Sequence, residues 1–135
     1  MKKGIIFGFL CLIFVTGCHK RGPESALALN RVHFDFESSS IKSDMMPVLN
    51  ANATYLKKHN VNHVTIEGNC DERGTNEFNL ALGDERAGAV KDYLVSRGIG
   101  ENQIRTVSYG EEHPMDKGHN ESAWYMNRRA DFLKQ

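Results

Sequence analysis

Apolar and polar residues alternate over residues 32–36 and again over residues 63–67, the pattern of strands with one buried face. In the first stretch, Val32, Phe34 and Phe36 would share that face. We predict two further strands, over residues 103–109 and near residues 129–133. Four strands of this length are enough for one small sheet.

Between the strands, apolar residues recur every three or four positions, which indicates amphipathic helices. Ser43 is the predicted cap of a helix that ends near residues 59–60 and buries Met45, Val48, Leu49, Asn52, Tyr55 and Leu56. The clearest helix covers residues 76–97, with a stripe of Leu80, Gly83, Ala87, Val90 and Leu94, and Gly98 follows it as a C-terminal cap glycine. A short helix is predicted from residue 121 to about residue 127.

This order of strands and helices predicts an α/β (α+β) two-layer sandwich with the helices packed on one face of the sheet. A chain of 135 residues has room for one domain. Lys and Arg number 17, and Asp and Glu also number 17. This balance gives no sign of a nucleic-acid partner.

The first residues have the order of a signal peptide. Lys2 and Lys3 precede an apolar run over residues 5–15, and small residues follow just before Cys18. The run is short for a bilayer span, although a retained N-terminal anchor is the alternative. We therefore predict a signal peptide over residues 1–17, a lipidated Cys18 with a tether over residues 18–30, and one domain over residues 31–135.

The lipidation of Cys18 is implied by a resemblance. The sequence Val-Thr-Gly-Cys at residues 15–18 resembles the lipobox of bacterial lipoproteins, whose cysteine receives lipid before the peptide is cut in front of it. No Asp follows at residue 20, which in that family implies the outer membrane. Cys11 would be removed, so Cys70 alone stays as a thiol and no disulfide is expected. Cys70 is either a small, partly buried residue or a catalytic nucleophile.

The densest polar region is the loop over residues 68–75 and the helix after it. Asp71 lies in the loop, and Asn79 and Arg86 lie seven residues apart on nearly one face of the helix. A carboxylate and a guanidinium presented together suit a zwitterionic ligand. In the alternative, Asp71 only caps the helix and Arg86 is a solvated charge.

Three segments resemble the OmpA-like peptidoglycan-binding domain: residues 68–75, 79–87 and 127–130. Residues 107–114 and 118–119 resemble its lipid-anchored branch, the peptidoglycan-associated lipoproteins. The resemblance covers about residues 31–135 and implies a βαβαβ-type domain with a mixed sheet. The chain departs from the family pattern at Asn76, where Pro is common, and at Trp124, which we place outside the pocket.

The resemblance implies non-covalent binding of the peptidoglycan stem peptide at meso-diaminopimelate. Asp71 would accept the ammonium of that side chain, Arg86 would bind its carboxylate, and Asn79 would hydrogen-bond nearby. The expected residues around them are Phe36, Arg73, Thr75 and Arg129. Strand alternation lets only one of Arg128 and Arg129 face the pocket, and we choose Arg129.

The same resemblance implies an outer-membrane protein that faces the periplasm, binds TolB and other Tol proteins, acts in envelope integrity and cell division, and needs no cofactor or metal. One alternative is an OmpA-like lipoprotein of a secretion or motility complex. The other is a cell-wall hydrolase, but the six histidines form no HxH or HExxH motif. The sequence also has no recognisable catalytic triad pattern.

Overall fold

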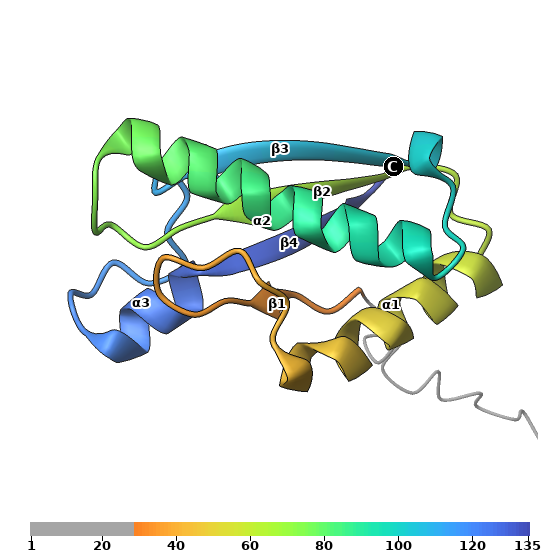
Figure 1. Cartoon of the computed structure of the whole chain (residues 1–135), viewed down its shortest axis with the longest axis horizontal. Helices are drawn as coiled ribbons and strands as arrows, with labels where there is room; N and C mark the ends of the chain where they lie inside the picture. The colour runs from red at the N-terminus through yellow and green to blue at the C-terminus, as the bar shows by residue number, and fades with distance from the viewer. Residues whose placement is uncertain (1–28) are drawn as a thin grey trace, which may run out of the picture.

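A computed structural model of the protein describes residues 29–135 (Figure 1). The predicted signal peptide, Cys18 and most of the tether lie outside these residues. The described part begins with strand β1 (Val32–His33), a 3-10 turn (Ser43–Met45), helix α1 (Met46–Lys58), strand β2 (Val64–Asn69) and helix α2 (Asn76–Ser96). It continues with a second 3-10 turn (Glu101–Gln103), strand β3 (Ile104–Gly110), helix α3 (Glu121–Asn127) and strand β4 (Arg129–Lys134).

The four strands form one mixed sheet in the order β1-β4-β2-β3. β2 and β3 run parallel, whereas β4 runs antiparallel to both β1 and β2. α1 and α2 lie on one face of this sheet (Figure 1). The predicted two-layer sandwich is confirmed. Its core consists of Val32, Phe34, Leu49, Ala53, Leu56, Val64, Ile66, Ala87, Val90, Leu94, Ile99, Ile104 and Ala130.

Two glycines bring α2 into direct contact with the sheet. A Cβ atom at Gly68 would overlap the carbonyl of Gly83, and one at Gly83 would overlap the Ser108 hydroxyl. Only glycine fits where two backbones approach so closely. This contact explains Gly83 in the predicted apolar stripe, and it draws the first half of α2 over the carboxyl end of β2.

The predicted elements differ from the structure in detail at three residues. β1 ends at His33, and the chain turns through Glu37, whose φ is 51°, so Phe36 leaves the predicted buried face and is 47% exposed. Ser43 lies inside the 3-10 turn and does not cap α1. Leu80 is exposed, because Asn79 and Leu82 take the inner positions on that turn of α2.

The chain enters the fold through a pair of asparagines. The buried side chain of Asn52, on α1, accepts a hydrogen bond from the Asn30 backbone N–H (2.9 Å) and donates one to the Asn30 carbonyl (2.7 Å). This contact fixes the start of β1.

No helix within residues 29–135 combines the length and apolar character that a membrane span requires. The core described above lies within residues 29–135, so a fragment from residue 19 onward retains it.

Candidate functional site

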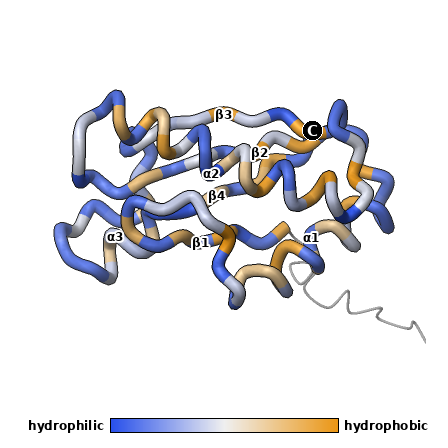
Figure 2. The backbone as a smooth tube through the Cα atoms, viewed as in Figure 1, coloured by the Kyte–Doolittle hydropathy of each residue, from blue (hydrophilic) through white to orange (hydrophobic). Residues whose placement is uncertain are grey.

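A small cavity lies at the end of the sheet where β2 passes into α2. This end is formed mostly by hydrophilic loops (Figure 2). The cavity is about 10 Å³, close to the room that one water molecule needs. It is lined by Phe36, Glu37, Cys70, Asp71, Arg73, Phe78, Asn79, Leu82 and Arg86. The structure therefore brings together five of the predicted site residues: Asp71, Arg86, Asn79, Phe36 and Arg73.

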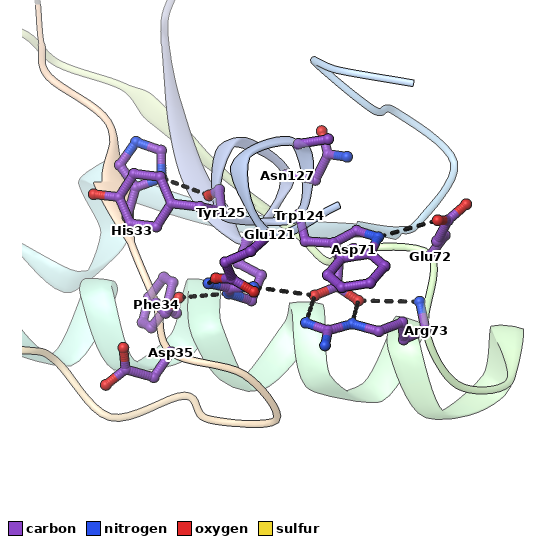
Figure 3. A network of polar contacts seen from close by, with 12 residues as sticks. His33, Phe34, Asp35, Asp71, Glu72, Arg73, Glu121, Trp124, Tyr125 and Asn127 are labelled. Atoms are coloured by element: carbon purple, nitrogen blue, oxygen red, sulfur yellow. Dashed lines mark hydrogen bonds and ion pairs between the residues drawn. The ribbon is translucent and has the colours of Figure 1, made fainter. Parts of the chain in front are cut away.

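Asp71 is a buried carboxylate with several donors around it (Figure 3). Its Oδ1 accepts from the backbone N–H (3.0 Å) and Nε (3.2 Å) of Arg73, and its Oδ2 accepts from Arg73 Nη2 (2.8 Å) and Arg128 Nη1 (3.5 Å). Burial by itself raises the pKa of Asp71, but the hydrogen bonds from Arg73 outweigh it and hold the pKa below its ordinary value. Asp71 is therefore an ionised acceptor at neutral pH.

Arg73 lies between two aromatic rings. Its guanidinium carbon is 3.8 Å from the ring centre of Phe36 and 4.0 Å from that of Trp124. The indole N–H of Trp124 donates to Glu72 (3.0 Å), and the same carboxylate oxygen contacts His119 Nδ1 at 2.6 Å. Trp124 therefore packs on the residue that holds Asp71, while it does not itself line the cavity, as predicted.

Arg86 is a buried cation on α2, 1% exposed. Its guanidinium donates to the backbone carbonyls of Asp35 (3.0 Å), Ser38 (2.8 Å) and Asn69 (2.9 Å). Within residues 29–135 no carboxylate lies within salt-bridge distance of it. Burial lowers the pKa of Arg86, because desolvation penalises its charge. The alternative that Arg86 is a solvated charge is wrong.

The helix cap is Thr75 rather than Asp71, since the Thr75 hydroxyl accepts from the Phe78 N–H (3.2 Å). Thr75 does not line the cavity. Asn79 is buried and donates to the carbonyls of Asp71 (3.3 Å) and Arg73 (3.1 Å). Thr75 thus starts α2, and Asn79 holds the loop that carries Asp71 while it also lines the cavity.

Cys70 is a buried thiol whose Sγ donates to the Asn79 carbonyl at 3.2 Å. Burial raises the pKa of this thiol to about 11. A thiol with this pKa is protonated at neutral pH and is a weak nucleophile. The structure thus favours the interpretation of Cys70 as a small buried residue.

Of the two adjacent arginines, Arg128 faces the site and Arg129 does not. Arg128 donates to Asp71, to the Phe34 carbonyl (2.9 Å) and to Glu121 (2.6 Å). Arg129 donates to Asp131 (2.8 Å) and to the His113 carbonyl (3.0 Å). Our choice of Arg129 is corrected. Arg128 lies between α3 and β4, so strand alternation does not apply to it, and its contacts with Asp71 and Phe34 place it at the site.

Comparison with known proteins identifies the family of this chain. The OmpA family model matches residues 33–128. The chain belongs to the OmpA family. The peptidoglycan-associated lipoprotein of Rhizobium meliloti is 50% identical over 118 residues, which cover 85% of this chain and 67% of the relative. That of Mesorhizobium japonicum is 44% identical over 151 residues, covering 96% and 90%. Within the family the chain therefore groups with the peptidoglycan-associated lipoproteins.

Solved structures agree with this grouping. The crystal structure of the peptidoglycan-associated lipoprotein from Burkholderia pseudomallei has 47% identity and a TM-score of 0.78, and the match covers 85% of this chain and 98% of that one. The C-terminal domain of Helicobacter pylori MotB has a TM-score of 0.72 at 22% identity, covering 80% and 85%. The second likeness is one of fold alone.

Proposed function

We propose that this chain is a lipid-anchored, non-catalytic protein of the cell envelope that binds the stem peptide of peptidoglycan at meso-diaminopimelate. Its relatives are named for their association with peptidoglycan. Asp71 and Arg86, which we call the clamp because they are predicted to hold the two charges of the ligand, line one cavity. The free end of a diaminopimelate side chain carries an ammonium and a carboxylate on one carbon. Asp71 takes the ammonium and Arg86 takes the carboxylate.

One observation carries this proposal: the buried charge of Arg86 has backbone carbonyls as partners but, in residues 29–135, no carboxylate at salt-bridge distance. A buried charge is costly unless it is paired. Three of the five guanidinium N–H groups of Arg86 donate to the carbonyls. The other two donate to no oxygen within residues 29–135, although the Cys70 thiol lies beside the guanidinium, and we propose that they bind a carboxylate that enters the cavity.

Binding to purified sacculi tests the clamp, with the fragment from residue 19 onward. Asp71→Ala and Arg86→Ala should each weaken binding at least about 30-fold, because removing one member of a desolvated charge pair costs about 2–5 kcal/mol. Arg105→Ala, at an exposed position on β3, is the control and should bind as the unmutated domain does.

The ligand can be changed in place of the protein. Lysine keeps the side-chain ammonium but lacks the carboxylate, so wall fragments with lysine should lose the Arg86 contact alone. Against such fragments, Arg86→Ala should cost little more, whereas Asp71→Ala should still weaken binding. Equal binding of lysine-type and diaminopimelate-type fragments by the unmutated domain would refute the clamp.

The anchoring and the partners are part of the same proposal. Lipid on Cys18 holds the chain to the outer membrane, residues 18–30 form the tether, and the domain over residues 31–135 reaches the wall from the periplasmic side. We propose that TolB and other Tol proteins are its partners, and that the chain serves envelope integrity and cell division as part of a Tol system.

A further inference from the structure

The carboxylate of Asp71 has no acceptor position left for a ligand. An ionised carboxylate offers about four lone-pair sites. Each oxygen of Asp71 already accepts two hydrogen bonds: Oδ1 from the Arg73 backbone and Nε, and Oδ2 from Arg73 Nη2 and Arg128 Nη1. The cavity beside it is about 10 Å³, the room that one water molecule needs. A ligand can therefore reach Asp71 only by displacing a donor.

The donors differ in how readily they can leave. The backbone N–H of Arg73 is fixed in the loop that Asn79 holds. Arg128 has a side chain only 5% exposed and has two further acceptors, Phe34 and Glu121. The side chain of Arg73 is 29% exposed, and both of its donating nitrogens bind Asp71. The Arg73 guanidinium is thus the donor that can exchange (Figure 3).

The surroundings of Arg73 provide for such an exchange. The ring centres of Phe36 and Trp124 lie 3.8 and 4.0 Å from its guanidinium carbon, and such cation–π contacts do not depend on the hydrogen bonds to Asp71. The indole of Trp124 is itself held by a hydrogen bond to Glu72, so the position of this ring beside Arg73 is fixed. A guanidinium that leaves Asp71 therefore keeps favourable contacts at the mouth of the cavity.

We propose that Arg73 is an internal surrogate for the ligand's ammonium: it neutralises Asp71 in the empty site, and the ligand displaces it on binding. This inference rests on the proposed function and deepens it. Arg73 then sets the affinity of the site by competing with the ligand, and it keeps the buried carboxylate of Asp71 paired when no ligand is present. Neutral side chains cannot compete with a bidentate guanidinium, so the exchange selects ligands that bring a cation.

Arg73→Gln tests the surrogate. If Arg73 competes with the ligand for Asp71, the substitution should raise the affinity for the ligand, whereas if Arg73 is a fixed part of the binding surface, it should lower the affinity. In calorimetric titration of the fragment from residue 19 with free meso-diaminopimelate, the variant should bind roughly tenfold more tightly than the unmutated domain. Its stability to urea without ligand should fall, since Asp71 loses two charge-assisted hydrogen bonds. Arg73→Lys, which retains charge but not the bidentate geometry, should lie between the two. Arg105→Gln is the matched control and should change neither quantity.

Two outcomes separate the surrogate from the proposed function. If the unmutated domain binds diaminopimelate and Arg73→Gln binds it more weakly, Arg73 is a fixed part of the binding surface and the surrogate is refuted. If the unmutated domain binds no diaminopimelate, the proposed function itself fails, and the surrogate fails with it.

A spectroscopic readout follows the exchange directly. The Nε–H of Arg73 donates to Asp71 Oδ1, so its NMR signal should shift, and its hydrogen exchange should speed up, when diaminopimelate is added. A folded domain that binds the ligand with an unchanged Arg73 Nε–H signal would also refute the surrogate.

Discussion

The guanidinium of Arg86 donates to the carbonyl oxygen of Asn69 across 2.9 Å, so a cation on α2 closes the carboxyl end of β2. The same group donates to two carbonyls in the segment after β1. Arg86 thus joins three separate parts of the chain while it lines the cavity. Arg86 therefore has a role in stability beside its proposed role in binding, and the folding of Arg86→Ala is checked by circular dichroism before its binding is compared.

Arg86→Lys should lower the free energy of unfolding by more than about 2 kcal/mol, although the positive charge is retained. One ammonium cannot reach three carbonyls that are arranged around a planar guanidinium. Urea unfolding followed by circular dichroism measures the change, and Arg97→Lys, at the exposed end of α2, is the control. An unchanged urea midpoint would show that the three carbonyl contacts contribute nothing.

The pKa of Asp71 makes stability depend on pH in one direction. Burial alone would raise this pKa, but the hydrogen bonds from Arg73 depress it below the ordinary value of 3.8. A depressed pKa means that the unfolded chain binds protons first as the pH falls. The contribution of Asp71 is therefore fully present above about pH 4. It is lost as the pH falls through the folded-state value.

Urea unfolding between pH 7 and pH 2.5 measures this dependence. The unmutated domain should be clearly more stable than Asp71→Asn at pH 7, and the difference should shrink in acid. Asp92→Asn, at an exposed position of α2, gives the comparison. A difference between the unmutated domain and Asp71→Asn that stays constant with pH would mean that Asp71 is not held ionised by its partners.

Cys70 should react slowly with thiol reagents in the folded domain. With a pKa of about 11, roughly one thiol in a thousand is ionised at pH 8. The fragment from residue 19 contains no other cysteine, so release of the aromatic thiol from Ellman's reagent reports Cys70 alone. The rate should rise sharply in urea, and equal rates with and without urea would contradict the buried thiol.

Replacing the thiol should matter little for binding. Cys70→Ser keeps a donor for the Asn79 carbonyl and should retain sacculus binding within a few fold. A variant that is folded by circular dichroism but no longer binds sacculi would give Cys70 a part in ligand recognition.

Cys18→Ser should release the protein from membranes without unfolding the domain. The lipid would be the only link to the bilayer, and each buried methylene contributes roughly 0.8 kcal/mol. Fractionation after complete digestion of peptidoglycan measures the anchor separately from wall binding. If the variant still sediments with the outer membrane, lipid on Cys18 is not the anchor.

Sequence periodicity predicted the helix layer and the sheet layer, because the burial pattern of each element follows from the residues within that element. The stripe of α2 and the alternation of β2 each follow from which side chains must leave water. Phe36 and Leu80 departed from this pattern for other reasons. Phe36 is carried outward by the turn at Glu37, and Leu80 is displaced because the polar Asn79 has loop carbonyls to satisfy.

The site was predicted less completely, since its partners come from distant parts of the chain. Asp71 and Arg86 follow from one loop and one helix, but Arg128 is 57 residues from Asp71 and Trp124 is 52 residues from Glu72. Spacing within one element cannot bring such pairs together. Arg73 is only two residues from Asp71 in the sequence. The spacing nevertheless does not show that hydrogen bonds from Arg73 occupy acceptor positions of the Asp71 carboxylate.

The contact between Asn30 and Asn52 has a mechanical consequence. Tension applied at the N-terminal end would enter the described fold at Leu29 and Asn30, and eight residues after Asn30 it would reach Ser38, whose carbonyl holds Arg86. Along this short path lie the Phe34 carbonyl that holds Arg128 and the Phe36 ring that covers Arg73. A load carried between membrane and wall would therefore run through the proposed binding site, and the contacts of Leu29 with the core and of Asn30 with Asn52 would bear the strain first.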